Sequence, residues 1–304
     1  MSQILERLPS GARVTVIRLR SLGDCVLTTP ALHLLKQFRP DLAVSVVVEP
    51  HFAAVFQGNP DVDSILPPEP LAMVHERAEL SVNLHGGPRS MMLTGAGMAR
   101  YRAGFGHHRQ AWLYNVPIPR AQEILGVERT VHTAEHLASA MFYLGVPQTE
   151  VPRARLFPPE FDGPPSPHAV IHPFAALPEK AWTVEGFLAV ARHLQLDHHL
   201  EPVFIGGAED DMTPFLDYRC LRGAPLREVM SLLANASLFT GNDSGPAHMA
   251  AACGVPVLVL YGASDPVVWA PWRTDSEIIV EPGGIARVPR RRVIEALDRL
   301  RVRA

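Results

Sequence analysis

The chain has 304 residues, of which 47% are hydrophobic and 19% are charged, and its formal net charge is −3 at pH 7. This length and hydrophobic content suit two globular domains with cores of their own, and the slightly acidic balance argues against a dedicated nucleic-acid-binding protein. No apolar run approaches the roughly 20 residues that span a bilayer, and no secretion signal is recognisable, so we expect a cytoplasmic protein. The three cysteines, Cys25, Cys220 and Cys253, are far apart and lack C-x-x-C spacing, which predicts neither disulfides nor a zinc site.

The first half of the chain alternates strands and helices. Apolar, β-branched stretches predict three strands, over residues 13–19, 43–48 and 80–84. A helix is expected over residues 28–38 with Pro30 near its start, so that Asp24, in the turn before it, lies at the carboxyl edge of the sheet. That turn holds a single glycine and lacks the G-x-G-x-x-G fingerprint, and the G-x-x-x-x-G-K-[ST] phosphate loop is also missing. Both absences disfavour a nicotinamide dehydrogenase and a P-loop ATPase.

A helix over residues 133–144, stopped by Gly145, precedes a stretch dense in proline and glycine at residues 157–167. This stretch predicts the boundary between two domains, residues 1–160 and 161–304. The strand and helix alternation then resumes, with strands expected at 169–172, 202–205, 236–239 and 255–260. The second of these strands is followed by the acidic loop Glu209-Asp210-Asp211. An acid at this place accepts hydrogen bonds from ribose hydroxyls, although an exposed loop acid explains it almost as well.

The stretch Gly241-Asn242-Asp243-Ser244-Gly245-Pro246 predicts a tight turn between a buried strand and a helix that ends at Gly254. We expect Ser244 or Asp243 to cap the free amides at the start of this helix. A helix N-terminus at the carboxyl end of a parallel strand presents unpaired N–H groups and partial positive charge, which suits phosphate binding. The same residues are also ordinary turn formers, and His248, in the first helical turn, is equally well explained as a buried core histidine.

The C-terminal segment, residues 286–304, is strongly basic. A solvated helix face explains its arginines, and Arg287, Arg290, Arg291 and Arg292 are also placed to meet anionic lipid head groups. The histidine pairs His107-His108 and His198-His199 are not at metal-ligand spacing on a helix. We expect both pairs at the surface and no metal site.

Three stretches taken together resemble glycosyltransferase family 9, the ADP-heptose:lipopolysaccharide heptosyltransferases. They read VIRLRSLGDCVLTTPAL, NLHGGPRS and GNDSGPAHMAAACGVPVLVLYGASDP. The pattern D-S-G-P-x-H, followed by G-V-P and a G-x-x-D-P turn, is specific when it occurs with an N-terminal R-x-x-x-[LI]-G-D. The resemblance implies an α/β protein of GT-B architecture, with two Rossmann-like domains whose parallel sheets face each other across a cleft. The N-terminal domain would bind the acceptor and the C-terminal domain the nucleotide sugar.

The resemblance also implies an activity. It is the inverting transfer of heptose from ADP-L-glycero-D-manno-heptose to the inner core of lipopolysaccharide by direct displacement, with no cofactor and no metal ion. Asp24 matches the family's general base, and Lys180 matches the cation that meets the departing phosphates. The residues that match the donor-binding turn are Asp243, Ser244, Gly245 and His248. Since Asp243 is an anion, we expect it to bind sugar hydroxyls or neighbouring amides rather than phosphate.

Some matching positions leave alternatives open. Glu209 and Asp211 are expected to bind the donor, but register alone does not decide which acid of residues 209–211 faces the nucleotide. Arg18 and Arg89 lie in matching segments, and each either holds an acidic group of the acceptor or pairs with a neighbouring carboxylate. Pro173-Phe174-Ala175 stands where the family commonly has Pro-Gly, which puts close backbone approach to the donor in doubt there.

The partners implied are an ADP-heptose donor, a lipopolysaccharide core acceptor and the cytoplasmic face of the inner membrane, with no nucleic acid. One alternative keeps the fold and the chemistry but takes another nucleotide-sugar donor or a protein acceptor. A second alternative is a non-catalytic binding protein whose two lobes clamp a ligand.

Overall fold

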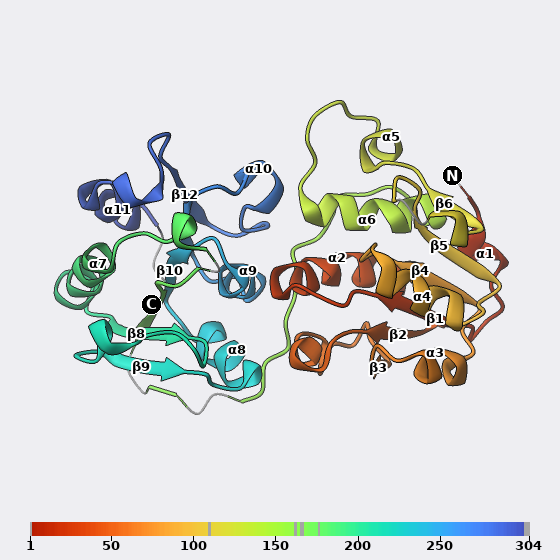
Figure 1. Cartoon of the computed structure of the whole chain (residues 1–304), viewed down its shortest axis with the longest axis horizontal. Coiled ribbons are helices and arrows are strands. Elements are labelled where there is room, and N and C mark those ends of the chain that lie inside the picture. Colours follow the sequence, from red (N-terminus) through yellow and green to blue (C-terminus); the bar gives the residue numbers. More distant parts are fainter. Residues whose placement is uncertain (1, 109–110, 161–162, 165–166, 176, 301–304) are drawn as a thin grey trace. The chain divides into compact units, whose positions relative to one another are not determined.

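The computed structural model describes residues 2–108, 111–160, 163–164, 167–175 and 177–300 (Figure 1). The chain forms two compact units, residues 1–157 and 158–304, which we call unit 1 and unit 2. Each unit is built on one six-stranded sheet in which all neighbouring strands are parallel. This confirms the α/β class and the two Rossmann-like domains predicted from the sequence. No helix in the described ranges has the length and hydropathy needed to cross a membrane.

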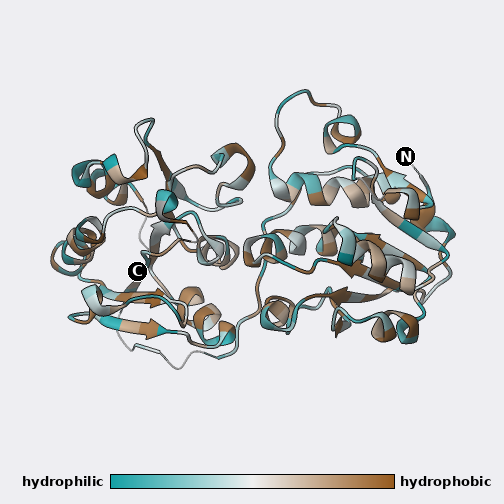
Figure 2. Cartoon of the chain, in the orientation of Figure 1, coloured by the Kyte–Doolittle hydropathy of each residue, from teal (hydrophilic) through white to brown (hydrophobic). Residues whose placement is uncertain are grey.

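Unit 1 has the strand order β3-β2-β1-β4-β5-β6. Its strands are β1 (Arg13–Ile17), β2 (Ala43–Val47), β3 (Ser64–Leu66), β4 (Leu80–Asn83), β5 (Tyr101–Phe105) and β6 (Val116–Ile118). Its helices are α1 (Ile4–Arg7), α2 (Leu22–Phe38), α3 (Pro70–Glu76), α4 (Pro88–Ala96), α5 (Ala121–Leu125) and α6 (Thr133–Leu144), with short 3₁₀ segments η1 (Pro50–Phe56) and η2 (Ala111–Leu113). The central strands β1 and β4 are almost completely buried, as expected for strands covered by helices on both faces. Much of this sheet is coloured as hydrophobic in Figure 2.

The first helix after β1 starts earlier than the sequence predicts. α2 begins at Leu22, not near Thr28, so Asp24 lies in the first helical turn and Pro30 lies inside the helix. Ser21 is the N-cap, and the Asp24 carboxylate accepts a hydrogen bond from the Ser21 backbone N–H, which completes a capping box. Pro30 has no N–H for the carbonyl of Val26, and the hydroxyl of Thr29 donates to that carbonyl instead, at 2.8 Å. The substitute hydrogen bond explains how the helix passes through the proline.

Unit 2 has the strand order β12-β11-β10-β7-β8-β9. Its strands are β7 (His168–His172), β8 (Glu201–Gly206), β9 (Arg219–Arg222), β10 (Leu238–Asn242), β11 (Val257–Tyr261) and β12 (Ser276–Val280). Its helices are α7 (Val184–Leu196), α8 (Leu226–Ala234), α9 (Gly245–Ala252), α10 (Pro266–Trp269) and α11 (Arg290–Leu297), with 3₁₀ segments η3 (Pro178–Lys180), η4 (Thr213–Phe215) and η5 (Ile285–Arg287). The predicted glycine at the end of α9 is confirmed, because Gly254 has φ +71°.

In the sheet of unit 2, β8 and β9 lie on one side of β7, and β10, β11 and β12 lie on its other side. The order in which strands are added therefore changes between β7 and β10, which are neighbours. Gly241, near the end of β10, is required there, since a Cβ atom would lie 2.6 Å from the carbonyl oxygen of His172. Asn242, the last residue of β10, is fully buried and donates to the carbonyl of Pro173 at 2.8 Å. In open parallel sheets such a switch point, at the carboxyl ends of the strands, is where ligands bind.

Candidate functional site

Asp24 is held at the carboxyl edge of the unit 1 sheet by three hydrogen bonds. Its Oδ2 atom accepts from the backbone N–H and the hydroxyl of Ser21, at 3.2 and 3.0 Å. Its Oδ1 atom has one long contact, 3.4 Å from Nη1 of Arg18. The side chain is 20% exposed. Oδ2 therefore fixes the carboxylate to the helix start, while Oδ1 keeps lone pairs that a further donor can reach.

Arg18 is buried beneath this carboxylate. Burial lowers the pKa of its guanidinium, and the negative charge of Asp24 opposes that shift. The sequence left two alternatives for Arg18, binding an acidic group of the acceptor or pairing with a neighbouring carboxylate. In the structure Arg18 pairs with the carboxylate of Asp24. Its burial makes it a group that fixes Asp24 in place rather than one that reaches solvent.

A histidine cluster that the sequence analysis missed lies at the same edge. It consists of His85, which follows β4, His107 and His108, which follow β5, and His136 on α6. Burial lowers the pKa of all four, and the charge of Arg18 contributes to the shift at His85, His108 and His136. Whereas His107 is exposed as expected, His108 is half-buried against Gly86, where a Cβ would lie 2.4 Å from its ring. The edge around Asp24 is thus lined by neutral imidazoles.

His136 should make the stability of unit 1 depend on pH. Its ring stacks on Phe105 with centroids 4.0 Å apart, and burial lowers its pKa from 6.5 to about 4. Because the unfolded chain then binds a proton between pH 6.5 and pH 4 that the folded chain does not, stability falls as pH falls through this window. We expect a loss of about 3 kcal/mol relative to a non-titrating variant. Urea unfolding of the native chain and of His136→Phe at pH 7 and pH 4 measures it.

The control for this prediction is His75→Gln, which removes an exposed histidine of α3 and should leave the pH dependence as in the native chain. An identical pH dependence in His136→Phe and in the native chain would contradict the prediction.

A cavity of about 430 Å³ opens beside this cluster in unit 1, and Arg20, His85 and Arg89 are among its lining residues. The Arg89 guanidinium is paired with Glu49, yet its side chain is 54% exposed. Arg89 thus combines the two alternatives raised by the sequence, since it has a carboxylate partner and is still accessible. Two arginines on the wall of one cavity suit a ligand that carries an acidic group.

Asn83, at the end of β4, builds the turn that carries His85 into this cavity. Its side-chain oxygen accepts from the backbone N–H groups of His85 and Gly86, at 3.0 and 3.1 Å, and its amide donates to the hydroxyls of Ser90 and Thr94, both at 3.1 Å. The buried amide thus donates two hydrogen bonds and accepts two, so its hydrogen-bonding capacity is satisfied. The turn and the start of α4 are therefore tied to the strand.

In unit 2, the start of α9 differs from the sequence expectation. Among the residues that the structure describes, no side chain caps the helix, so the expected capping by Ser244 or Asp243 is wrong. Ser244 has the extended backbone that is usual for an N-cap residue, yet its buried Oγ has no hydrogen-bond partner among the described residues. The first amides of α9 are consequently left without a side-chain acceptor within the described part of the chain, and a helix start of this kind suits an anion next to Gly245.

Lys180 lies at the same edge of the sheet. Its Nζ donates to the Ser264 hydroxyl at 2.7 Å. The backbones also meet closely, because a Cβ on Gly262 would lie 2.6 Å from the carbonyl oxygen of Glu179. The backbone N–H of Trp182 donates to the buried Asn242 side chain at 3.1 Å, which ties the Lys180 loop to the end of β10. The lysine is thus anchored beside the residues that follow β10 and β11.

In the loop that begins Pro173-Phe174, the aromatic side chain packs inside unit 2. The Phe174 ring packs on Gly206, where a Cβ would lie 2.8 Å from it, and edge-on against Phe215, with centroids 6.0 Å apart. Phe174 is therefore partly buried and packs against the apolar core of unit 2.

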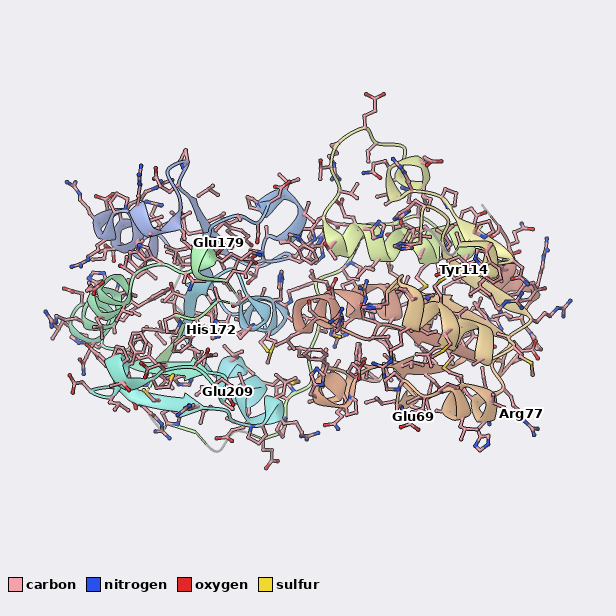
Figure 3. All side chains as sticks on the ribbon, viewed as in Figure 1. Glu69, Arg77, Tyr114, His172, Glu179 and Glu209 are labelled. Carbon is pink, nitrogen blue, oxygen red and sulfur yellow. The ribbon has the colours of Figure 1, made fainter. Side chains whose placement is uncertain are left out.

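The three acids after β8 have separate environments. Asp210 closes its own turn by accepting from the N–H of Gly207 at 2.7 Å, and Asp211 accepts from the N–H of Thr213 at 3.0 Å. The hydrogen bonds from Thr213 lower the pKa of Asp211. Glu209 is exposed and has no hydrogen-bond partner within the described part of the chain (Figure 3). Glu209 is therefore the acid whose oxygens are available to a ligand.

The remaining donor-turn residues surround the start of α9. His248 is buried in its first turn, with its ring edge-on to Trp269 at a centroid distance of 6.4 Å. The backbone N–H of Asp243 donates to the carbonyl of Leu260 at 3.0 Å, and its side chain is half-buried. Asp243, Ser244, Gly245 and His248 thus gather at one strand end, and Lys180 is tied to the same strand end through Asn242.

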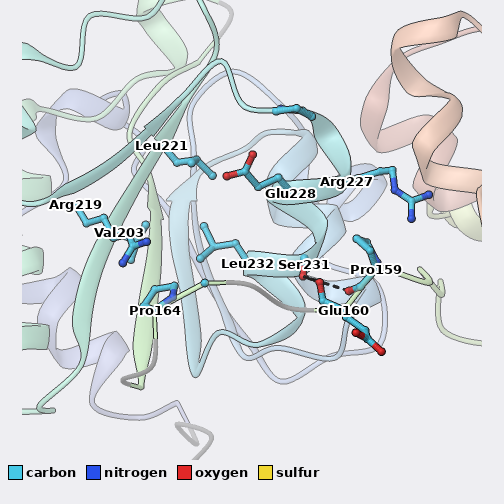
Figure 4. Close-up of a pocket in the computed structure, with 12 residues that line it drawn as sticks. Pro159, Glu160, Pro164, Val203, Arg219, Leu221, Arg227, Glu228, Ser231 and Leu232 are labelled. Atoms are coloured by element: carbon cyan, nitrogen blue, oxygen red, sulfur yellow. Dashed lines mark hydrogen bonds between the residues drawn. The ribbon is translucent and has the colours of Figure 1, made fainter.

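Two other features lie away from these residues. A cavity of about 360 Å³ in unit 2 is lined by residues of β8, β9 and α8, where Ser231 donates to the carbonyls of Pro159 and Glu160 (Figure 4). None of the predicted site residues lines it. In the basic C-terminal segment, Arg291 pairs with Glu295 and Arg292 with Glu281, so two of its four named arginines have acidic partners.

Comparison with known proteins identifies the family. Residues 72–284 match glycosyltransferase family 9 (heptosyltransferase). The chain is 26% identical to lipopolysaccharide heptosyltransferase 3 of Escherichia coli K12 over 91% of this chain and 90% of that protein. It is 21% identical to the lipopolysaccharide core heptosyltransferase OpsX of Haemophilus influenzae, over 87% of this chain and 83% of that one.

Solved structures agree on the fold. A family 9 glycosyltransferase from Veillonella parvula superimposes with a TM-score of 0.82 at 21% identity, covering 95% of this chain and 97% of that one. The E. coli ADP-heptose lps heptosyltransferase II gives a TM-score of 0.80 at 20% identity, covering 94% and 97%. The GT-B class expected from the sequence is confirmed. The chain belongs to glycosyltransferase family 9 and is a glycosyltransferase.

Proposed function

We propose that this enzyme transfers heptose from ADP-L-glycero-D-manno-heptose to a sugar of the lipopolysaccharide inner core with inversion at the anomeric carbon. The observation that carries the proposal is the set of groups at the carboxyl edge of the unit 2 sheet. An uncapped helix start, a hydroxyl without a partner and a lysine suit a diphosphate. The names of the relatives, which are lipopolysaccharide heptosyltransferases, support the choice of sugar and acceptor.

Asp24 is the general base in this proposal. The acceptor hydroxyl oxygen attacks the anomeric carbon, the bond from that carbon to the diphosphate oxygen breaks, and the hydroxyl proton passes to the carboxylate. Oδ1 is the accepting atom, because Oδ2 is held by two hydrogen bonds from Ser21. Arg18 is a positioning residue that keeps the carboxylate in place.

The leaving ADP meets positive charge on the donor side. The amides at the start of α9 and the Ser244 hydroxyl bind the diphosphate, and Lys180 stabilises the charge that develops on the leaving oxygen. Asp243 binds hydroxyls of the heptose, and His248 contacts the donor from the first helical turn. Glu209, the acid of this loop that has no hydrogen-bond partner in the described ranges, accepts from the ribose hydroxyls.

The cavity in unit 1 takes the acceptor. Arg89 and Arg20 on its wall bind acidic groups of the lipopolysaccharide core, for which guanidinium groups are well suited. The inferred acceptor and the basic residues of the C-terminal segment also support peripheral contact with an anionic membrane surface.

Binding of nucleotides to the free enzyme tests the donor assignment. We expect ADP at about 100 times its Kd to stabilise the chain by ~2.7 kcal/mol, and UDP, GDP and NAD at the same concentration to give much smaller shifts. Glu209→Gln should weaken ADP binding by about 1.5–3 kcal/mol, since it removes a charged hydrogen-bond acceptor. Thermal denaturation with each nucleotide measures these shifts.

Asp211→Asn is the matched control, because Asp211 is exposed in the same loop but already accepts from Thr213. Its ADP shift should equal that of the native chain. A larger shift with UDP or NAD than with ADP would overturn the donor assignment, and glycosyl transfer measured with a panel of donors then separates another family 9 activity from a binding protein that transfers nothing.

A further inference from the structure

Two histidines and an aspartate of unit 2 converge on one point away from the residues discussed above. His193 lies in the last turn of α7, His198 follows the end of that helix, and Asp298 follows the end of α11. Oδ1 of Asp298 lies 2.8 Å from Nε2 of His193 and 2.9 Å from Nε2 of His198. The two rings stand almost perpendicular, at 76°, so that their edges meet at the carboxylate.

The spacing of these atoms suits a metal ion. One ligand atom from each residue lies within 4.8 Å of the other two. Tetrahedral ligands at about 2.1 Å from a zinc ion are about 3.4 Å from one another, so the cluster has to open by roughly half an ångström to admit it. Asp298 can make this adjustment, since its side chain is 50% exposed and lies beyond the helix end.

A second carboxylate supports one of the ligands from behind. Oδ2 of Asp197 lies 2.9 Å from Nδ1 of His193. Metal-binding histidines almost always donate their other ring N–H to such an acceptor, which fixes the tautomer and presents Nε2 to the ion. His193 has this arrangement, with Nδ1 directed at Asp197 and Nε2 directed at Asp298 and the point where the three residues converge.

The surrounding charges also favour a cation. Within the described part of the chain, neither Asp197 nor Asp298 forms an ion pair with a lysine or arginine. The neighbouring Arg299 is engaged by both carboxylate oxygens of Glu277, at 3.1 and 2.7 Å. The two aspartates therefore leave the cluster negatively charged.

We propose that His193, His198 and Asp298 bind a divalent transition-metal ion of the zinc class, with Asp197 as the outer partner of His193. Two imidazoles and one carboxylate suit Zn²⁺, Co²⁺ or Ni²⁺ better than Mg²⁺ or Ca²⁺, and water completes the coordination. Because His198 lies shortly before β8, which begins at Glu201, the site lies at the amino edge of the sheet, opposite the candidate donor site. The ion ties α11 to α7 and is independent of the transfer reaction.

Equilibrium titration of the full-length chain, prepared without a histidine tag, tests this site. We expect one equivalent of Zn²⁺ to bind, measured by competition with a chromophoric chelator, and Co²⁺ to give the visible absorption of a bound ion. Asp197→Asn should weaken binding by about 10- to 100-fold, as outer partners of metal ligands do. His193→Gln and Asp298→Asn should weaken it by at least about 100-fold, since each removes a direct ligand.

His75→Gln, which removes an exposed histidine of unit 1, is the matched control and should bind as the native chain does. Amide hydrogen exchange adds a second measurement, because bound Zn²⁺ should slow exchange in α11 of the native chain and not in Asp298→Asn. If His193→Gln fails to fold, His198→Gln and Asp298→Asn carry the test. Absence of stoichiometric Zn²⁺ binding, or equal affinity in the native chain and Asp298→Asn, would overturn the proposal.

Discussion

Replacing Asp24 with asparagine should lower turnover by about 10²- to 10⁴-fold, the range that a general base contributes. Asparagine has nearly the same shape, and its side-chain oxygen can still accept from the Ser21 N–H at the start of α2. It cannot take up the proton of the acceptor hydroxyl. The steady-state rate of ADP release with donor and acceptor both present measures the effect.

Two comparisons make this result specific to the base. The ADP-induced thermal shift should be the same in Asp24→Asn and the native chain, since the donor groups belong to unit 2. Ser21→Ala, which removes one hydrogen bond to Oδ2 and leaves the carboxylate in place, should lower turnover by no more than about tenfold. Turnover of Asp24→Asn within a few-fold of the native enzyme would remove Asp24 from this role.

The sequence predicted the elements that depend on local residue patterns and the strands that are buried on both faces. β11 is a continuous apolar run, and β1, β4 and β10 are buried over all or nearly all of their length, because helices cover both faces of a central parallel strand. Of the strands that were missed, β3, β6, β9 and β12 are edge strands, and β5, which is paired on both sides, reads Tyr-Arg-Ala-Gly-Phe and has a short apolar signature. β9 reads Arg-Cys-Leu-Arg and β6 contains Pro117, and each is the edge strand of its sheet. An edge strand is partly exposed and carries charge or proline, so it has no apolar signature.

In the candidate site, too, the residues that belong to short local patterns were predicted, and the contacts between distant segments were not. Asp24, Lys180 and Asp243 belong to short segments whose residue order could be compared with a family. The contacts between segments that are far apart in the chain could not be compared in this way. Asn242 supports the Lys180 loop through Trp182, which lies 60 residues away in the chain, and His136 reaches the edge near Asp24 from α6. Such contacts depend on tertiary packing, which no local pattern records.

At the start of α9, a rule for predicting helix capping from the sequence fails. Serine and aspartate before a helix predict capping, because their side chains usually accept from the free amides. Ser244 has φ −161° and ψ 166°, and no side chain caps the helix. A sequence rule that holds for stable helices fails here at the residues proposed to bind phosphate, as expected where local stability is given up for function.

Replacing Lys180 with glutamine should lower kcat/KM by about 10²- to 10³-fold, the cost of removing one group that stabilises charge in a transition state. Glutamine keeps a long polar side chain that can still contact Ser264 but has no positive charge for the leaving diphosphate. Ser264→Ala is the matched control, because it removes the partner of Lys180 and leaves the charge. Its effect should not exceed about tenfold, because the positive charge that meets the diphosphate stays in place.

The role of Lys180 follows from whether the substitution lowers kcat or the affinity for the donor. The charge on the diphosphate oxygen grows as its bond to the sugar breaks, so a lysine aimed at that oxygen interacts more strongly with the transition state than with the bound donor. We therefore expect kcat of Lys180→Gln to fall by a larger factor than its affinity for the intact donor. Titration of the donor under single-turnover conditions separates the two quantities. An unchanged kcat with a weakened donor affinity would make Lys180 a binding residue and leave stabilisation of the leaving group to the amides of α9.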